Sequence, residues 1–357
     1  MGVLRIQNAV PLGPRTTLEL GGRAEVLIEV GSLLELDEAL KWATDSSRSV
    51  KVLGGGSNVV IADEGCAGVV VVPALRGIDI DRRGDRVLVT AAAGEVWDEV
   101  VAQTVSEGLV GLECLSGIPG TVGATPIQNV GAYGVEVSDV LEWVEVVDRA
   151  SGCVSRRSAA ECEFGYRTSW FKQNPDRSVV TRVAFRLQAG GLPVIRYREL
   201  QQAVGMDDAA PDASVVRDVV MALRQAKGMV LEADAPGSAG SFFVNPLVDA
   251  ETLASIEEAT GSEETVPRFE TGEHLFKIPA AWLIERTGFC RGFRQGPVGI
   301  SEHHALALVH HGGGRTADLV ALATAIRDGV ALLFGLRLRP EPVFWGFGDV
   351  HPLNGGS

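Results

Sequence analysis

The chain has 357 residues, of which 46% are hydrophobic and 22% charged, so it is long enough for two or three globular domains and is not a disordered protein. Its net charge of −14 argues against a general binder of nucleic acid or of anionic membranes, because such proteins present a basic face. Five scattered cysteines without a CxxC pair, the lack of a signal-peptide pattern and the shortness of the apolar runs predict a cytoplasmic protein with no membrane segment, and we expect a monomer.

Hydrophobic periodicity and turn residues predict three domains, at residues 1–75, 76–228 and 229–357. The first is expected to contain strands at 25–30, 51–53 and 69–72 and a helix at 33–44. The second is expected to contain strands at 86–92, 143–148 and 179–187, helices at 96–107 and 215–227, and a surface loop at 206–214. The third is expected to contain helices at 250–260, 280–287 and 316–334, a strand at 305–309 and an extended arm at 336–346.

A glycine-rich loop, Gly54-Gly55-Gly56-Ser57-Asn58, follows the predicted strand at 51–53. Glycines let backbone N–H groups approach a phosphate closely, and the serine and asparagine add side-chain donors. The β-branched residues at 59–61 do not open a helix, which argues against a Rossmann fingerprint, and no Gly-Lys pair exists to form a P-loop. A plain tight turn is the alternative for this loop on its own.

A second loop, at 115–134, mixes five glycines and two prolines with isoleucine, valine and tyrosine. A flexible linker would be rich in serine and charged residues, so this composition predicts a buried loop that wraps around a ligand. Two such loops in neighbouring predicted domains indicate a large cofactor.

Four motifs in chain order carry a family resemblance: the Gly-Gly-Gly-Ser-Asn loop, the Ile-Pro-Gly-Thr-Val-Gly to Gly-Ala-Tyr-Gly run at 118–134, Phe-Gly-Tyr-Arg at 164–167 and Gly-Ser-Phe-Phe-Val-Asn-Pro at 240–246. The chain therefore resembles the UDP-N-acetylenolpyruvoylglucosamine reductase (UDP-N-acetylmuramate dehydrogenase) family over nearly its whole length. The resemblance implies an α+β fold, with a two-part FAD-binding region of the vanillyl-alcohol-oxidase type followed by an α/β substrate-binding domain. The carboxyl-terminal arm is expected to return to the active site.

The resemblance also implies a reaction. Such an enzyme reduces UDP-N-acetylglucosamine enolpyruvate to UDP-N-acetylmuramate in peptidoglycan precursor synthesis, with non-covalent FAD and with NADPH as the hydride donor, in a ping-pong sequence. The expected FAD-binding residues are Gly54, Gly55, Gly56, Ser57, Asn58, Ile118, Pro119, Gly120, Thr121, Val122, Gly123, Gln128, Asn129, Gly131, Ala132 and Tyr133.

Three residues are expected to act on the substrate chemically. By resemblance, Arg167 neutralises the charge that develops on the substrate carboxylate side, and its bidentate fork suits a carboxylate. Ser241 is the matching proton donor and Glu341 its partner in protonation. Taken without the resemblance, these would be a surface arginine, a helix-cap serine and a solvated glutamate between two prolines, and nothing in the sequence distinguishes Ser241 from Ser238.

Substrate contacts are expected from Tyr166, Tyr197, Arg224, Lys227 and Asn245. Tyr197 resembles a tyrosine of the family subtype that has an extra loop over the nucleotide. The basic pair at 224 and 227 matches positions that meet pyrophosphate or NADPH phosphates, although such a pair is ordinarily a solvated helix face. The sequence departs from the family at Val244, where a basic residue is frequent, and this puts one phosphate contact in doubt.

The histidines restrict the remaining possibilities. All six lie at or after His274, so the two glycine loops hold no histidine for a covalent flavin bond, and Cys66 and Cys114 are the only loop-side alternatives considered. The pairs at 303–304 and 310–311 invite a metal site, but no acidic or cysteine partner has ligand spacing, and we expect no metal. An oxidase or dehydrogenase of the same flavin superfamily and a flavin-binding regulatory protein remain as alternative functions.

Overall fold

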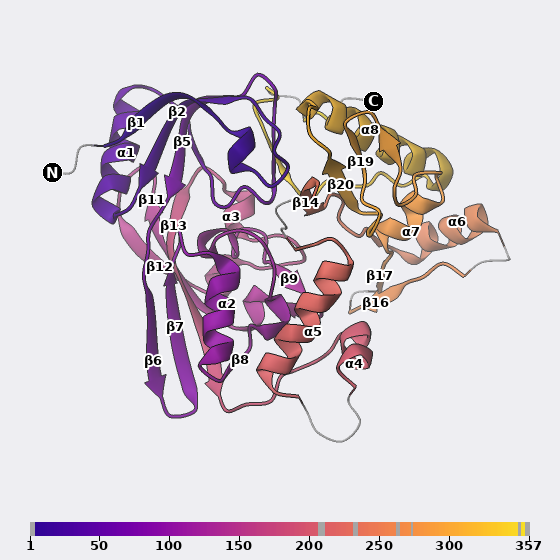
Figure 1. The fold of residues 1–357 in the computed structure, drawn as a ribbon, viewed down its shortest axis with the longest axis horizontal. Coiled ribbons are helices and arrows are strands. Elements are labelled where there is room, and N and C mark those ends of the chain that lie inside the picture. The colour runs from indigo at the N-terminus through magenta and orange to yellow at the C-terminus, as the bar shows by residue number, and fades with distance from the viewer. Residues whose placement is uncertain are drawn as a thin grey trace. The chain divides into compact units, whose positions relative to one another are not determined.

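The computed structural model describes residues 4–205, 211–230, 235–261, 265–272, 274–348 and 351–353. They belong to two compact units (Figure 1). Unit 1 consists of Met1–Val10, Ala24–Gly56 and Ala67–Leu231, and unit 2 of Pro11–Arg23, Ser57–Cys66 and Glu232–Ser357. The expected loop at 206–214 lies in part, at 206–210, outside the described residues. The three-domain division at 75 and 228 remains a prediction.

Unit 1 begins with a four-stranded sheet in the order β1 (Ile6–Pro11), β2 (Arg23–Val30), β5 (Cys66–Pro73) and β3 (Val50–Val52). Helix α1 (Leu33–Asp45) covers it, and its buried Leu36, Ala39 and Leu40 share a core with the valines and isoleucine of these strands. Ser32 caps the helix, because its side chain accepts a hydrogen bond from the amide of Glu35.

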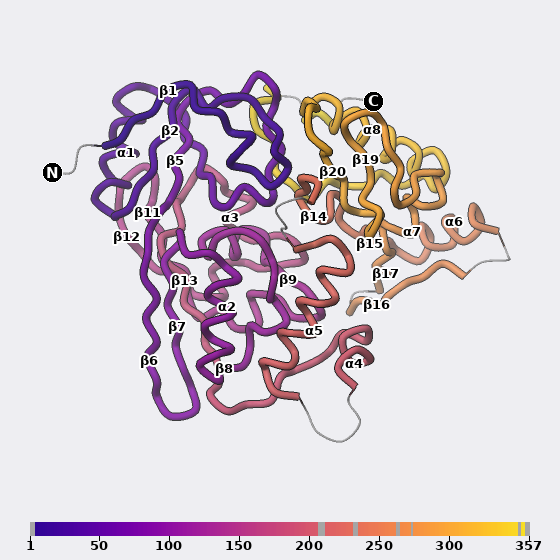
Figure 2. The backbone as a smooth tube through the Cα atoms, viewed as in Figure 1, coloured from indigo at the N-terminus to yellow at the C-terminus, as the bar shows by residue number. Residues whose placement is uncertain are grey.

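A six-stranded sheet forms the rest of unit 1, in the order β12 (Val154–Ser158), β11 (Leu141–Asp148), β13 (Ser178–Ala189), β7 (Arg86–Ala92) and β6 (Ile78–Arg83), with β8 (Leu109–Val110) also paired to β13. The β6–β7 hairpin extends as a long loop of the tube in Figure 2. Helix α2 (Trp97–Ser106) packs on the sheet, where Trp97 meets Phe185 of β13 edge-on with ring centroids 5.6 Å apart. Helix α5 (Ala213–Ala226) packs against α2 and against the turn at Glu113–Leu115.

Short elements complete unit 1. They are the helices α3 (Trp170–Gln173) and α4 (Arg198–Val204), the strands β9 (Gly131–Ala132) and β10 (Val135–Glu136), and 3-10 turns at Glu113–Leu115, Val122–Ala124, Val137–Asp139 and Ala160–Cys162. The expected irregular loop at 115–134 therefore contains a short 3-10 turn and a strand.

Unit 2 contains three small sheets. Their strands, in spatial order, are β14 (Gly237–Ser241), β20 (Ala307–His310), β19 (Val298–Ile300) and β18 (Arg294–Gln295); then β15 (Leu247–Val248), β17 (Leu275–Lys277) and β16 (Phe269–Thr271); then the parallel pair β21 (Val343–Trp345) and β4 (Val59–Ile61). Helices α6 (Ala250–Thr260), α7 (Ala280–Glu285) and α8 (Thr316–Phe334) share one hydrophobic core with these sheets. A 3-10 turn spans Gly13–Arg15.

The predicted helices and most predicted strands are confirmed, with ends displaced by up to two residues, or three at the start of β5. The strand expected at 305–309 begins only at Ala307, because the amide of Leu306 donates to Nδ1 of His304 and the amide of Ala307 donates to the carbonyl of His304. These bonds close a turn at residues 304–307, although the alternation of residues there is typical of a strand. Strands β6 and β12 were not predicted, and they are largely exposed and charged.

Candidate active site

The two glycine loops of unit 1 touch each other backbone to backbone. A Cβ atom added at Gly55 would lie 2.6 Å from the Cα of Gly120, and one added at Gly54 would lie 2.8 Å from Oγ1 of Thr121. At Gly55 the near atoms are backbone, so a side chain there would require the loops to move, whereas at Gly54 the near atom is a side-chain oxygen that could shift by itself. The glycines at 54 and 55 therefore allow close approach of two chain segments, so a plain tight turn does not account for them.

The second loop is fixed from within by Asn129, which is buried and has a left-handed φ of 48°. Its Nδ2 donates to Oε2 of Glu136 at 2.7 Å and to the carbonyl of Gly165 at 3.3 Å, while its Oδ1 accepts from the amide of Ser138 at 3.0 Å. These bonds occupy the polar atoms of this side chain. Asn129 thus holds the shape of the predicted cofactor loop, and any contact that it makes with a cofactor falls to its backbone.

Arg167 sits at the tip of a tight turn that is tied to this loop. The amide of Gly165 donates to the carbonyl of Thr168 at 3.1 Å and the reverse bond is 3.2 Å, which leaves Tyr166 and Arg167 as the two central residues. Nη2 of Arg167 donates to the carbonyl of Gly131 at 2.8 Å. The guanidinium is therefore directed toward the second glycine loop.

The backbone of Arg167 has a φ of 55°, a conformation that an L-residue with a side chain adopts at a cost. Left-handed backbone at a non-glycine residue costs about 1–2 kcal/mol. A glycine would relieve that cost, so arginine at this position indicates that the side chain is needed there.

A second cluster in unit 1 joins Tyr133, Tyr197 and Lys227. The two tyrosine rings meet edge-on at 5.6 Å, and Nζ of Lys227 lies 5.7 Å from the ring of Tyr133 while forming an ion pair of 2.6 Å with Glu199. Burial raises the pKa of Tyr133 to about 12, so its hydroxyl stays protonated at neutral pH. Tyr197 is exposed and occupies the N-cap position of α4, where its side chain makes no capping hydrogen bond.

Arg224 of α5 differs from an ordinary solvated helix residue, because its side chain is only 8% exposed. Its Nη2 donates to the carbonyl of Met229 at 3.0 Å, but its Nε has no hydrogen-bond partner within the described residues. The guanidinium packs on Gly117, where an added Cβ would lie 3.2 Å from that Nε. Burial lowers the pKa of Arg224, and an anionic cofactor at the loop would offset this cost.

Unit 2 holds Ser241 at the end of β14, opposite Ala307 of β20. The pairing is irregular between Ser238 and Ser241, and Gly240 between them has a φ of 71°. The hydroxyl of Ser238 accepts a hydrogen bond of 3.1 Å from the amide of Gly240. The hydroxyl of Ser241 has no hydrogen-bond partner among the residues that the structure describes, so both its donor and its acceptor sites are open to a ligand, whereas the Ser238 hydroxyl already accepts one bond.

The carboxyl-terminal arm returns to this serine within unit 2. The amide of Glu341 donates to the carbonyl of Phe242 at 2.9 Å, and the amide of Val244 donates to the carbonyl of Arg339 at 2.9 Å. Nδ2 of Asn58, from the end of the first glycine loop, reaches the carbonyl of Glu341 at 3.5 Å. The structure thus brings together Phe242 and Glu341, which lie 99 positions apart in the sequence, and Asn58 and Glu341, which lie 283 apart.

Asn245 has a structural bond in addition to its predicted role. Its Oδ1 accepts the amide of Ala280 at 2.8 Å and so caps the start of α7, which leaves its Nδ2 for a ligand. The side chain of the neighbouring Val244 is half-buried and uncharged, so it supplies no phosphate contact at the position where a basic residue was expected.

His310, one of the paired histidines, has a structural role. His310 is buried, with Nδ1 placed 3.1 Å from the carbonyl of Leu18 and Nε2 accepting the amide of Gly314 at 3.0 Å. In the part of the chain that the structure describes, no group of three or more His, Cys, Asp or Glu side chains could hold a metal ion. Burial raises the pKa of Cys114 to about 12, which leaves little thiolate for covalent attachment.

Within each unit, then, some predicted residues lie together: Arg167 with the second glycine loop in unit 1, and Ser241, Glu341 and Asn58 in unit 2. Sequence reasoning missed Asp98 and Arg217, which form a bidentate ion pair of 2.6 Å and 2.8 Å in unit 1. Both are charged residues on predicted helices 119 positions apart, and no sequence pattern joins them.

Comparison with known proteins extends this description. Residues 231–345 match the family model described as UDP-N-acetylenolpyruvoylglucosamine reductase, C-terminal domain, and residues 24–157 match the FAD binding domain model. A UDP-N-acetylenolpyruvoylglucosamine reductase of Thermobifida fusca is 48% identical over 347 residues, covering 94% of this chain and 97% of its own. A protein of the same name from Mycobacterium ulcerans is 45% identical over 359 residues, covering 96% of both chains.

A solved structure has the same fold. The crystal structure of the UDP-N-acetylenolpyruvylglucosamine reductase from Thermus caldophilus matches with a TM-score of 0.67 and 26% identity, covering 96% of this chain and 100% of its own. The fold class expected from the sequence is thereby confirmed. Among the described residues, none of the helices is both long enough and apolar enough to span a bilayer.

Proposed function

Since the chain belongs to the UDP-N-acetylenolpyruvoylglucosamine reductase family and is an FAD-dependent oxidoreductase, we propose that it reduces UDP-N-acetylglucosamine enolpyruvate to UDP-N-acetylmuramate with NADPH. The enzyme and family assignments displace the regulatory-protein and oxidase hypotheses. The proposal places the reaction in peptidoglycan precursor synthesis, in a cytoplasmic monomer. The net charge of −14 supports the absence of nucleic-acid and membrane partners.

The observation that carries the proposal is the hydroxyl of Ser241. Reduction of the enolpyruvyl double bond adds a hydride to one carbon and a proton to the other. A serine hydroxyl is a weak acid, so it donates only to a strong base such as a carbanion, and only if it is positioned for the transfer. Its strand end is held by paired backbone, while its hydroxyl has no partner among the described residues. Glu341, whose amide is bonded to the next residue in the motif, is proposed to assist the proton transfer.

Arg167 is proposed to bind the substrate carboxylate and to stabilise the negative charge that develops beside it. A guanidinium offers paired donors that match a carboxylate, and preorganised donors of this kind lower the barrier where charge develops. The left-handed turn and the bond to Gly131 supply the preorganisation. Tyr166 on the same turn, Tyr197, Lys227 and Asn245 are proposed as substrate contacts.

FAD, when bound, supplies the carrier that takes a hydride from NADPH and passes it to the substrate. The chain's own groups fit an anionic dinucleotide, because two glycine loops meet at backbone distance and the buried Nε of Arg224 beside the second loop has no partner among the described residues. We propose that the backbone of 54–56, 118–123, 128–129 and 131–133, with Ser57 and Asn58, holds it without a covalent bond. The packing of Arg224 on Gly117 favours a contact with FAD over the substrate contact expected from the sequence.

The two half-reactions test the proposal. In the Ser241→Ala variant, rapid mixing with NADPH should reduce the flavin at nearly the parent rate. Reoxidation by the enolpyruvyl substrate should slow by about 10²–10⁴-fold, the usual contribution of a positioned general acid. An equal loss in both half-reactions would contradict the role of Ser241, and a parent enzyme whose reduced flavin does not react with this substrate would contradict the reaction itself.

A further inference from the structure

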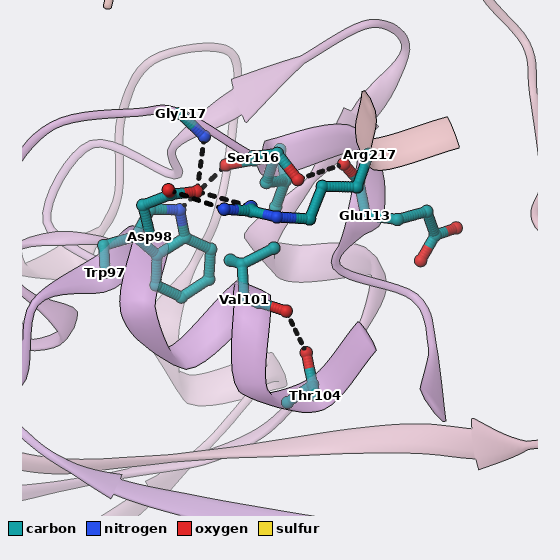
Figure 3. Close-up of polar contacts among 9 residues, drawn as sticks. Trp97, Asp98, Val101, Thr104, Glu113, Ser116, Gly117 and Arg217 are labelled. Atoms are coloured by element: carbon teal, nitrogen blue, oxygen red, sulfur yellow. Dashed lines mark hydrogen bonds and ion pairs between the residues drawn. The ribbon is translucent and has the colours of Figure 1, made fainter. Parts of the chain in front are cut away.

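The amino end of helix α2 is the point to which the second glycine loop of unit 1 is fastened. The amide of Trp97 donates to the carbonyl of Gly120 at 3.0 Å, and its indole Nε1 donates to the carbonyl of Leu115 at 3.0 Å. Between these two bonds the amide of Gly117 donates to Oδ1 of Asp98 at 2.6 Å. Figure 3 shows the carboxylate of Asp98 between this amide and the guanidinium of Arg217.

Asp98 therefore makes two kinds of bond at once. Arg217 of α5 donates through Nη1 and Nη2 to its two oxygens at 2.6 Å and 2.8 Å, with 17% and 29% of the Arg217 and Asp98 side chains exposed. Such a partly buried, bidentate pair is stronger and more directional than a surface ion pair. Burial, the largest influence, acts to raise the pKa of Asp98, but the bonds from Arg217 and Gly117 together lower it.

Gly117 has no room to adapt at this junction. Its φ of 70° lies in the left-handed region, and an added Cβ would lie 2.8 Å from Sδ of Met221 on α5. The loop is therefore pressed against α5 while its amide is held by α2. A shift of either helix would move the residues that follow directly, Ile118, Pro119 and Gly120.

Arg224 lies on the same helix as Arg217, seven residues later, which is about two turns and so the same face. Its guanidinium packs on Gly117, and its Nε has no hydrogen-bond partner in the described part of the chain. The carboxylate of Asp98 thus holds the second glycine loop and α5 at the same time. It therefore fixes the position of the loop and of the helix face that carries the buried Arg224.

We infer that Asp98 and Arg217 are positioning residues for binding of a pyrophosphate-containing dinucleotide: the Asp98 carboxylate holds the Gly117 amide and the Arg217 guanidinium together, so that the 118–120 backbone and Arg224 meet the cofactor's anionic groups. The inference deepens the proposed FAD site and rests on it. It requires the carboxylate to act both as the acceptor for the loop and as the partner of the helix.

Two variants separate these requirements. Asp98→Asn keeps an oxygen that can accept from Gly117 but removes the ion pair. The double variant Asp98→Arg with Arg217→Asp restores opposite charges between the helices but leaves no acceptor for the Gly117 amide, because arginine has donors only. Asp37→Asn is the matched control, since Asp37 forms an exposed ion pair with Lys41 on α1.

FAD release from the full-length holoenzyme is measured by the rise in flavin fluorescence on serial dilution, with the flavin circular dichroism spectrum recorded at saturating FAD. Loss of a hydrogen bond to a charged group corresponds to about 10–100-fold in Kd, so we expect both variants to release FAD at least about 10-fold more readily, with an altered flavin spectrum. The control should leave Kd and spectrum unchanged.

Two outcomes would overturn the inference. If the charge-swapped double variant regained the parent Kd and spectrum, the pair would only join two helices. If Asp98→Asn unfolded at lower temperature at saturating FAD but kept the parent Kd and spectrum, its role would be structural. Since FAD release is measured without NADPH or enolpyruvyl substrate, failure of the proposed reaction in the parent enzyme would be seen separately.

Discussion

The polar groups of the second glycine loop in unit 1 and of the end of β14 in unit 2 differ in how far they are hydrogen-bonded. In the loops, Asn129 has its side-chain polar atoms bonded, and Gly117 has its amide held by a carboxylate. At the strand end, the backbone around Ser241 is paired on both sides, yet the hydroxyl has no partner among the described residues. A cofactor loop needs one fixed shape, whereas a proton donor needs a fixed backbone and a free side chain.

Among changes to the glycine loops, Gly55→Ala should have the largest effect on stability and on FAD content. The added Cβ would lie 2.6 Å from the Cα of Gly120, and both segments are backbone, so neither can yield easily. We expect the free energy of unfolding to fall by about 1–3 kcal/mol and the purified protein to retain less FAD. Urea unfolding and the ratio of flavin to protein absorbance measure the two effects.

Gly31→Ala is the control for that substitution, because a Cβ there would meet only Oε2 of Glu35 at the ordinary distance of 3.5 Å. It should leave both stability and FAD content close to those of the parent. If both substitutions lowered stability and FAD content equally, the close contact between the glycine loops would not be the reason for a glycine at position 55.

Two substitutions of Arg167 separate the backbone strain at this residue from the proposed catalytic role of its guanidinium. Arg167→Ala and Arg167→Gly both remove the guanidinium, so each should lower kcat/KM for the enolpyruvyl substrate by about 10–100-fold, the range for a lost charged hydrogen bond. Only glycine tolerates the φ of 55°, so the glycine variant should be more stable than the alanine variant by about 1 kcal/mol. Steady-state kinetics and urea unfolding test this; equal stabilities would contradict the strain.

Glu113, whose carbonyl accepts a hydrogen bond from the hydroxyl of Ser116, should make the free energy of unfolding depend on pH. Burial, despite a bond of 2.6 Å from the amide of Gly111, raises the pKa of this carboxyl above its ordinary 4.5. Its contribution to stability is therefore fully present below pH 4.5 and is lost as the pH rises through the folded-state pKa. The stability of the parent relative to Glu113→Gln should fall as the pH rises from 4.5 toward neutrality, as measured by urea unfolding; a difference independent of pH would contradict this.

The smallest effect is expected from Ser238→Ala. The Ser238 hydroxyl accepts one bond of 3.1 Å from Gly240 in a half-buried turn, and its loss should change kcat by no more than about two-fold. The matched comparison is Ser241→Ala in the same assay. A loss as large as that in Ser241→Ala would show that the whole strand end, and not one hydroxyl, governs protonation.

Much of the architecture could be predicted from local pattern. The helices α6 and α8 begin and end at the predicted residues, because their hydrophobic spacing and end signals are local in the sequence. Strands β6 and β12 were missed because they lie at sheet edges, where exposed charged residues conceal the alternation. Burial and pairing partners, which decide such strands, are not contained in a short window of sequence.

The motif resemblance identified the family, the cofactor and the candidate residues, but it could not rank Ser241 against Ser238. Only the folded backbone around β14, where the amide of Gly240 donates to the Ser238 hydroxyl, showed which of the two hydroxyls is already bonded. Likewise, the glutamate between two prolines resembled a solvated surface residue until the arm was seen to pair with the serine motif.

By itself, then, the sequence determined the helices, the glycine loops and the family, because periodicity, backbone freedom and motif order are local or linear properties. The tertiary structure decided which groups are satisfied and which remain free. Asp98 meets Arg217 across 119 positions, and Glu341 meets Asn58 across 283. Hydrogen bonding and burial depend on distances in space, and residues so far apart in the chain acquire those distances only when the chain folds.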